Sequence, residues 1–467
     1  MRLDQLTLQN YRCFDSVTIQ FHPELTVLIA PNGAGKTTVL DAARVALWPF
    51  VKGFDLGSQT GKAATVQISD VRMRLLSGGN MEPQIPCAIE ALGDWSPERL
   101  GQRWVQTRER VKVNTGTLGD NSTKKMTQYA KVLEKQVRDG QSTTLPLITY
   151  LGTSRLWYEG RFSSSAAATN MDKSDYSRTS GYLNCLAYSS RFKAFSAWYS
   201  WVYRSYSESR FIALEQNTPF DSAGNPFAHI VQVVKVAVDA LVKKSTGWHS
   251  LEFSERHHQQ LVMHHDQHGV MPVDILSDGL RNTIAMVADI AFRAYKLNPH
   301  WGIQAARETP GIALIDEVDM FLHPAWQQTI LGSLKEAFPK LQFIVSTHSP
   351  QVTTSIPSES IRVLSDGKVF AAPPGTEGAE SSRLLTRLFG VNSRPPETRA
   401  TQELNDYLKL IYANKWDEPS TKALRTVLDA RYRGEEPALT AADLHIENQK
   451  WERSLDAIDG DHIEDRS

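Results

Sequence analysis

Cysteine is scarce in this sequence. The 467 residues contain three cysteines, Cys13, Cys87 and Cys185, and no CxxC pair. This argues against a disulfide framework and a zinc ribbon, and it fits a reducing compartment. Long apolar runs are missing too, since no stretch approaches the ~18 uninterrupted apolar residues of a membrane-spanning helix. The N-terminus also lacks the apolar core of a signal peptide. We therefore expect a soluble, cytoplasmic protein without a membrane partner.

A strong charge of one sign is also absent. Lys and Arg total 51 and Asp and Glu total 52, which gives a net charge of -1. A globally basic nucleic-acid binder is therefore not indicated, although a local basic face stays open. With 41% hydrophobic and 22% charged residues, the composition is that of a folded protein. The length fits about three domains, or one large domain with insertions.

The first 45 residues predict a strand, a turn, a second strand, a loop and a helix, in that order. Val17, Ile19 and Phe21 alternate at period two, as in a half-buried strand. The apolar run 25–29 is typical of a strand covered on both faces. Apolar residues from Lys36 to 47 recur at helical spacing, and we expect Pro49 to end that helix.

We expect four segments along the chain. Residues 1–155 form the first part of the main domain with a β-rich insertion, and residues 156–249 form a helical insertion or arm. Residues 250–380 complete the main domain, and residues 381–467 form a polar, helical C-terminal extension. Within the arm, residues 160–180 are predicted to be a loop or linker.

An aromatic stripe in the arm has two interpretations. Phe192, Phe195, Trp198, Val202 and Tyr206 recur at three- and four-residue steps. Core packing of a helix is the favoured interpretation. A platform on which nucleic-acid bases stack is the alternative.

The most specific motif is Ala30-Pro-Asn-Gly-Ala-Gly-Lys-Thr37. It fits G-x-x-x-x-G-K-[ST] except at the first position, where Ala30 replaces glycine. Gly33 and Gly35 allow backbone N–H groups to converge on phosphate oxygens, and the following helix N-terminus adds positive potential. Lys36 is expected to reach the β- and γ-phosphates, and the Thr37 hydroxyl to bind Mg²⁺.

A second motif supplies carboxylates. The apolar run 311–315 ends in Asp316 and Glu317, which would lie at the carboxyl edge of a parallel sheet, beside the phosphate loop. We expect Asp316 to hold Mg²⁺ through water and Glu317 to polarise the attacking water.

Two weaker motifs complete the set. Ser277 opens a predicted helix, where its hydroxyl and the Gly279 amide can bind an anion, although a plain helix cap is the default for such a segment. His348 follows the apolar run 343–345 and is placed to contact the γ-phosphate.

These four motifs, in this order, resemble the ABC/SMC-like ATPases of the AAA family. The resemblance covers the first ~45 residues and about 270–365. It implies an α/β P-loop NTPase of ABC-ATPase type, with a β-rich and helical insertion between Walker A and the signature motif and a helical C-terminal extension. Asp316 and Glu317 are then Walker B, and His348 is the switch histidine. Asp278 at the second signature position is similar to the RecF- and OLD-like branch.

The resemblance also implies which residues act. ATP would be sandwiched between two heads, with the signature residues acting in trans. The residues expected to bind nucleotide are Arg12, Asn32, Gly33, Ala34, Gly35, Lys36, Thr37, Thr38, Ser277, Asp278 and Gly279. Those expected to be catalytic are Lys36, Glu317 and His348, and those expected to bind Mg²⁺ are Thr37 and Asp316. Gln67 is a weak candidate for the glutamine of the family's Q-loop.

Three further segments indicate which group of these ATPases the chain resembles. The segments 150–157, 316–327 and 387–395 resemble ATPases of Septu-type antiphage defence loci, which implies a partner HNH nuclease and head-to-tail homodimers. Two alternatives remain: a RecF/SMC-like DNA repair ATPase that contacts DNA itself, and a non-hydrolysing, ATP-dependent structural assembly.

Three further signals are given structural interpretations. Five of the 13 histidines lie in 256–268, where we expect a solvent-facing hairpin and no metal site. Asp459-Gly-Asp461 echoes a nuclease motif but lies in a polar tail, and no HNH pattern is present. A cluster of basic residues is interpreted as solvated surface, with a track for phosphate backbones as the alternative. It consists of Arg103, Arg108, Arg110, Lys112, Lys124 and Lys125.

Overall fold

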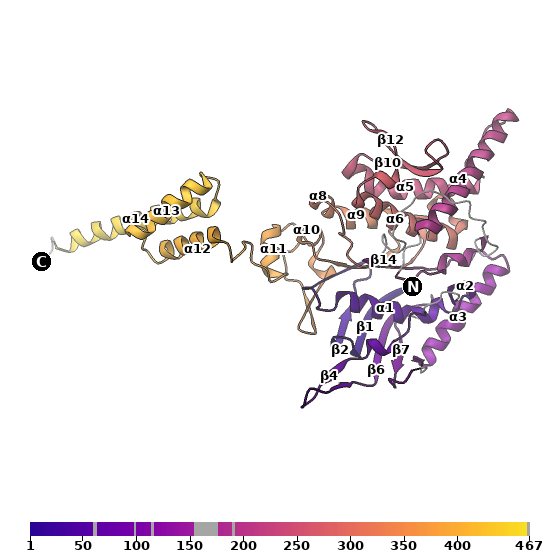
Figure 1. Ribbon diagram of the computed structural model, residues 1–467, viewed down its shortest axis with the longest axis horizontal. Helices are drawn as coiled ribbons and strands as arrows, with labels where there is room; N and C mark the ends of the chain where they lie inside the picture. Colours follow the sequence, from indigo (N-terminus) through magenta and orange to yellow (C-terminus); the bar gives the residue numbers. More distant parts are fainter. Residues whose placement is uncertain (59–62, 98–99, 114–115, 154–175, 189–191, 465–467) are drawn as a thin grey trace. The chain divides into compact units, whose positions relative to one another are not determined.

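The computed structural model describes residues 1–58, 63–97, 100–113, 116–153, 176–188 and 192–464. It has two compact units, residues 1–389 and 390–467 (Figure 1). The C-terminal extension was expected to begin at residue 381. Helix α11 (Ser381–Arg387) belongs instead to the first unit, because Leu384 and Leu388 are buried in its core.

A six-stranded sheet forms the centre of the first unit, in the order β16-β15-β3-β14-β13-β9. All neighbouring pairs are parallel except β15 with β16. Every residue of β3, β9, β13 and β14 is buried, as continuous apolar runs require when both faces of a sheet are covered. The strands are β3 (Leu25–Ile29), β9 (Leu147–Leu151), β13 (Gly311–Ile315), β14 (Leu341–Thr347), β15 (Ile361–Ser365) and β16 (Lys368–Ala371).

An antiparallel sheet packs with the central sheet around helix α1 (Lys36–Val51). Its order is β2-β1-β6-β7-β8, so the hairpin at the N-terminus is paired with strands of the insertion. Its strands are β1 (Arg2–Tyr11), β2 (Phe14–Gln20), β6 (Cys87–Asp94), β7 (Gln102–Arg108) and β8 (Leu118–Gly119). Helix α1 is buried along nearly its whole length and thereby holds the phosphate loop between two sheets.

Helix α1 does not end at Pro49, as the sequence predicted, but continues to Val51. A proline inside a helix removes the N–H that would bond to the carbonyl four residues earlier, here that of Val45. The buried side chain of Gln106 on β7 donates to the Val45 carbonyl instead. A tertiary contact therefore replaces the hydrogen bond lost at Pro49.

The insertion is less β-rich than expected, because helix α3 (Asn121–Arg138) crosses it. Asp120 caps this helix, accepting a hydrogen bond from the Thr123 N–H at 2.8 Å. Its apolar residues Met126, Ala130 and Leu133 are buried at helical spacing. The short elements of the insertion are α2 (Asp55–Ser58), η1 (Ile68–Asp70), β4 (Met73–Leu75) and β5 (Met81–Pro83).

A helical layer follows the insertion. Phe195, Trp198, Tyr199 and Val202 of α4 are buried, and the Trp198 ring lies 4.4 Å from that of Phe292 between centroids, so the described part of the aromatic stripe packs in the core. Most of the predicted linker 160–180 lies outside the described residues, and its end forms the buried turn η4 (Arg178–Tyr182). The layer contains α4 (Phe192–Glu215), α5 (Pro226–Thr246), α6 (Asp278–Leu297), α7 (Ala305–Glu308), α8 (Pro324–Gln327) and α9 (Ile330–Ala337).

The expected hairpin at 250–275 is a three-stranded sheet of β10 (His249–Ser254), β11 (Gln260–His265) and β12 (Gly269–Pro272). Among its histidines, His264 contacts Glu252 at 3.0 Å and His265 packs on Trp248. Within the described ranges no group of three or more His, Cys, Asp or Glu side chains is arranged to hold a metal ion.

The second unit confirms the predicted helical C-terminus. It contains α12 (Arg399–Tyr412), α13 (Pro419–Tyr432) and α14 (Pro437–Glu464), around a small core that includes Leu404, Ile411 and Leu428. The backbone of Asp459–Asp461 is part of α14. None of the helices in the described part of the chain has the length and apolar character needed to cross a membrane.

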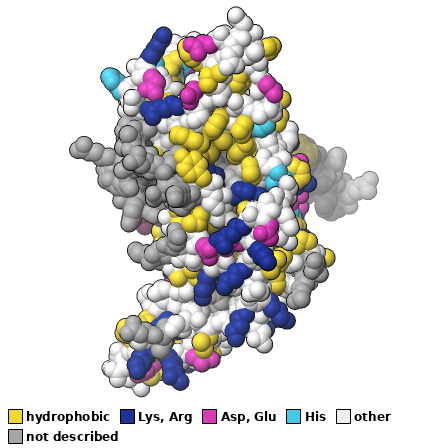
Figure 2. Space-filling model, turned by 90° about the vertical axis from the view of Figure 1, so that its right-hand side faces the viewer, with side chains coloured by type: hydrophobic (Ala, Val, Ile, Leu, Met, Phe, Trp, Pro, Cys, Tyr) yellow, Lys and Arg dark blue, Asp and Glu magenta, His cyan; other side chains and the backbone are white. Residues whose placement is uncertain are grey.

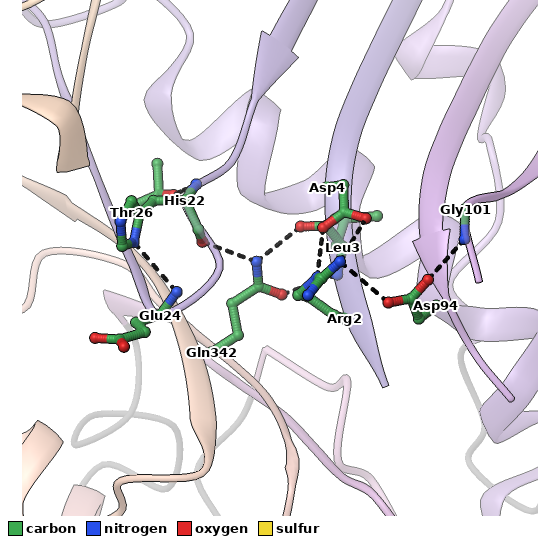
Figure 3. Close-up of polar contacts among 9 residues, drawn as sticks. All are labelled: Arg2, Leu3, Asp4, His22, Glu24, Thr26, Asp94, Gly101 and Gln342. Atoms are coloured by element: carbon green, nitrogen blue, oxygen red, sulfur yellow. Dashed lines mark hydrogen bonds and ion pairs between the residues drawn. The ribbon is translucent and has the colours of Figure 1, made fainter. Parts of the chain in front are cut away.

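One buried side chain joins the two sheets of the first unit (Figure 3). Gln342, at the start of β14, accepts from the Leu3 N–H at 2.9 Å. It donates to the Leu3 carbonyl at 2.7 Å and to the His22 carbonyl at 3.0 Å. Its amide therefore satisfies three backbone groups, and the two bonds to Leu3 are buried.

Replacing Gln342 by leucine is expected to lower the free energy of unfolding by about 2–4 kcal/mol, because buried backbone groups lose their partners. Urea unfolding of the full chain measures this. Gln328→Leu is the matched control, since Gln328 is exposed and bonds only to another side chain. A Gln342→Leu protein as stable as the control would contradict this role for the bridge.

A candidate nucleotide site at the edge of the central sheet

The phosphate loop connects β3 to α1, as its motif predicts. Gly33 and Gly35 adopt φ of 80° and 102°, the left-handed region that favours glycine. A Cβ on Gly35 would lie 2.5 Å from Cζ of Phe14, so this position also requires the small residue. Ala30, the departure from the motif, is buried at the end of β3, where a methyl group is accommodated.

The acidic strand end meets the phosphate loop. The Thr37 hydroxyl donates to Asp316 Oδ2 at 2.9 Å, across 279 positions of sequence. The Ser346 hydroxyl, from the neighbouring strand β14, donates to Asp316 Oδ1. The carboxyl ends of parallel strands share one edge of a sheet, which explains why these side chains converge.

Lys36 lies in the same cluster. It is buried, and its ammonium donates to the Ala30 carbonyl at 2.9 Å. Burial lowers the pKa of Lys36, and the nearby carboxylates of Asp316, Glu317 and Asp319 oppose that shift. A buried cation that has backbone carbonyls as hydrogen-bond acceptors is suited to exchange them for an anionic phosphate.

Glu317 has an unusual backbone. Its φ is 48°, and its N–H donates to the Ser346 hydroxyl at 2.8 Å. Non-glycine residues held in the left-handed region concentrate at functional sites, where the surrounding structure must enforce the conformation. Next to it, the Thr347 hydroxyl donates to Asp319 at 2.6 Å, and half-buried His348 follows directly after β14.

Arg12 lies beside the helix that carries Lys36 and Thr37. Its guanidinium bonds to Asp41 on α1 at 2.6 Å and to Asp70 at 2.8 Å. Asp41 also pairs with Arg44 at 3.0 Å. No sequence motif pointed to Asp41 or Asp70 as site residues. Gln67, the weak Q-loop candidate, is exposed and donates to the Thr65 hydroxyl at 2.8 Å.

The signature residues lie at the N-terminal end of helix α6. Ser277 caps α6, and Asp278 pairs with Arg281 on the same helix. A Cβ on Gly279 would lie 2.4 Å from the carbonyl oxygen of Phe321, so this glycine allows α6 to approach the loop after β13. Gly279 therefore lies against the loop after the acidic strand, whereas Lys36 and Thr37 contact Ala30 and Asp316.

Ser346 and Thr347 were not among the expected site residues. The sequence nevertheless contains a pattern that could have indicated them. They follow the apolar run 343–345, which forms part of β14, and β14 pairs with the acidic strand β13. Asp319 could not be found in this way, since its partner Thr347 is determined by the path of the loop after β13.

The donor set at the strand edge fits a magnesium ion. Thr37 offers a hydroxyl and Asp316 a carboxylate, 2.9 Å apart. Mg²⁺ is usually bound through one or two protein oxygens, with phosphates and water completing its shell. Thr37 and Asp316 would hold it, and its charge would supply neutralisation of the phosphate oxygens.

A glycine-bearing loop between a buried strand and a helix, joined to an acidic strand end, defines a P-loop NTPase. Its motif order is that of the ABC/SMC-like type. Two family models match the chain: "AAA domain" over residues 5–196, and "AAA domain, putative AbiEii toxin, Type IV TA system" over residues 160–354. The protein is a P-loop ATPase that is similar to AAA-domain proteins over these two ranges.

Its relatives include "Retron Ec83 probable ATPase" of Escherichia coli, 26% identical over 97% of this chain and 88% of that protein. The "Septu protein PtuA" of Bacillus mycoides is 33% identical, over 30% of this chain and 19% of that protein. Among solved structures, the SMC head domain from Thermotoga maritima superposes with a TM-score of 0.40 at 15% identity, covering 80% of this chain and 99% of that one.

Proposed function

We propose that this ATPase works as a head-to-tail dimer whose nucleotide state controls a partner HNH nuclease, of the PtuB kind, in bacterial antiphage defence. The observation that carries the ATPase part is the pair of hydrogen bonds that Asp316 accepts from the Thr37 and Ser346 hydroxyls. The relationship to retron ATPases and to Septu PtuA supports the defence role.

The proposed reaction is transfer of the γ-phosphoryl group of ATP to water. Lys36 and the loop amides hold the phosphates, and Thr37 and Asp316 hold the metal. Glu317 accepts a proton from the attacking water, and His348 contacts the γ-phosphate. Positioning and charge stabilisation supply most of the rate enhancement in this class of reaction.

The arrangement of one head supports the proposed dimer. Gly279 lies against the loop after β13, and Thr37, directly after the phosphate loop, bonds to Asp316. We propose that Ser277, Asp278 and Gly279 complete the nucleotide site of the other head, where the N-terminus of α6 favours an anion. The C-terminal unit, with exposed Tyr412, Leu444 and Trp451, is the proposed docking surface for the nuclease.

Complementation between two inactive variants tests this arrangement. Lys36→Ala disables the phosphate loop, and Ser277→Arg blocks the signature. In a mixed dimer one site combines the intact loop of one head with the intact signature of the other. An equal mixture should therefore recover about a quarter of wild-type phosphate release, because half of the dimers are mixed and each has one good site.

Recovery requires the signature to act in trans. If Ser277 served the nucleotide of its own head, every head in the mixture would remain defective and no phosphate would be released. Each variant measured alone at the same total concentration is the control, and its thermal unfolding shows that it is folded.

A further inference from the structure

The basic cluster predicted in the insertion does not form one surface. Arg103 is bound to Glu90 at 2.5 Å, and Arg108 is buried, with its guanidinium donating to the Val66 carbonyl at 3.1 Å. Both therefore have structural partners. Lys124 and Lys125 are different, because they lie on the exposed side of α3.

Helix α3 continues this basic character over three turns. Lys124, Lys131 and Lys135 are separated by steps of seven and four residues, which place them on one face, and Gln128 lies between them. All four side chains are exposed, and Lys125 flanks them. We call Lys124, Lys125, Gln128, Lys131 and Lys135 the α3 basic row. Figure 2 looks onto the side on which α3 lies in Figure 1, and Lys and Arg side chains run down its lower half.

The row is not neutralised by its own helix. In the described part of the chain none of its four lysines has a carboxylate within ion-pair distance. The one acidic residue of α3, Glu134, is buried and accepts from the Asp55 N–H at 3.1 Å, and burial raises its pKa. Arg138, at the end of the helix, is already paired with Asp55 and Glu134.

The helix is firmly held against α1. The Thr127 hydroxyl donates to the Pro49 carbonyl at 2.8 Å. A Cβ on Gly53 would lie 2.5 Å from Cβ of Ala130, so the two segments approach closely. The α3 basic row is therefore presented as a straight line of about 17 Å, from the rise of 1.5 Å per residue.

We propose that the α3 basic row binds the phosphate backbone of a nucleic acid. Lysines on a rigid helix are flexible point charges suited to successive phosphates, and an exposed amide adds a hydrogen-bond donor. The contacts are to the backbone, so binding is independent of base sequence.

Other anionic partners fit this face less well. A helix that lies on a membrane presents large apolar residues to the lipid. Here Met126, Ala130 and Leu133 are buried, and the exposed apolar side chain of this helix is Val132. Protein interfaces are depleted in lysine and enriched in aromatic residues, the reverse of this row.

The salt dependence of binding tests the proposal quantitatively. The triple variant Lys124→Gln, Lys131→Gln, Lys135→Gln is compared with Lys243→Gln, Lys244→Gln, Lys340→Gln, which removes three exposed charges elsewhere. The full chain is titrated with a 30-mer DNA duplex and with a single strand of the same length. Each lost phosphate contact reduces the slope of log K against log salt by about 0.9 for duplex and about 0.7 for a single strand.

We expect the α3 triple variant to lower the slope by about 2.7 on duplex or about 2.1 on a single strand, with roughly tenfold weaker binding at low salt. The form of DNA, duplex or single strand, for which the slope falls in this way is the form that the α3 basic row binds. The control triple should keep the wild-type slope, and both variants should keep wild-type thermal stability and basal phosphate release. Equal slopes for the two triple variants, or loss of binding only to phosphatidylserine vesicles or an acidic peptide, would overturn the proposal.

Discussion

Glu317→Gln is expected to leave ATP bound while phosphate release falls by roughly two to four orders of magnitude, the usual contribution of a general base. The substitution keeps the size of the side chain and leaves the backbone N–H free to donate to Ser346. It removes only the ability to accept a proton from water. Hydrolysis and binding should therefore separate in this variant.

Single-turnover phosphate release and binding of a fluorescent ATP analogue measure the two quantities. Glu336→Gln is the control, because it removes the same charge from an exposed position on α9. Wild-type turnover by Glu317→Gln would remove Glu317 from the mechanism. A protein that hydrolyses no ATP before or after the substitution would favour the structural-assembly alternative.

The parallel sheet and the position of the nucleotide site could be predicted from local sequence. The runs at 25–29, 147–151, 311–315 and 343–345 are predominantly apolar because both faces of the sheet are covered. The polar residues that follow three of these strands then converge at one edge, since carboxyl ends of parallel strands meet there. Apolar runs followed by polar residues can be recognised locally, without information on the rest of the chain.

What the sequence did not predict depends on tertiary partners. Helix α1 passes Pro49 because Gln106 satisfies the Val45 carbonyl, and the two residues lie 61 positions apart. Arg12 is fixed by Asp70, whose position is set by the path of the insertion. The sequence alone could not distinguish Arg103 and Arg108 from solvent-exposed residues. Arg103 pairs with a carboxylate and Arg108 with a backbone carbonyl, and both partners lie on other segments of the chain.

The buried ammonium of Lys36 leads to the second large expected effect. Lys36→Met should abolish the stabilisation of the protein by ATP while changing the free energy of unfolding of the ligand-free protein by less than about 1.5 kcal/mol, as for volume-conserving changes. Burial lowers the pKa of Lys36, so its charge is costly without a phosphate. Asp316 keeps hydrogen bonds from Thr37 and Ser346 when the lysine is removed.

Thermal unfolding with and without ATP and Mg²⁺ measures this effect. A ligand present at 100 times its Kd stabilises the native state by about 2.7 kcal/mol, which raises the Tm of the wild type by several degrees. Lys340→Met, at an exposed turn, should keep the full shift. An ATP-dependent shift that survives in Lys36→Met would mean that the triphosphate binds elsewhere. Loss of the shift with an unchanged ligand-free Tm would show that Lys36 acts on the ligand and that the fold does not depend on it.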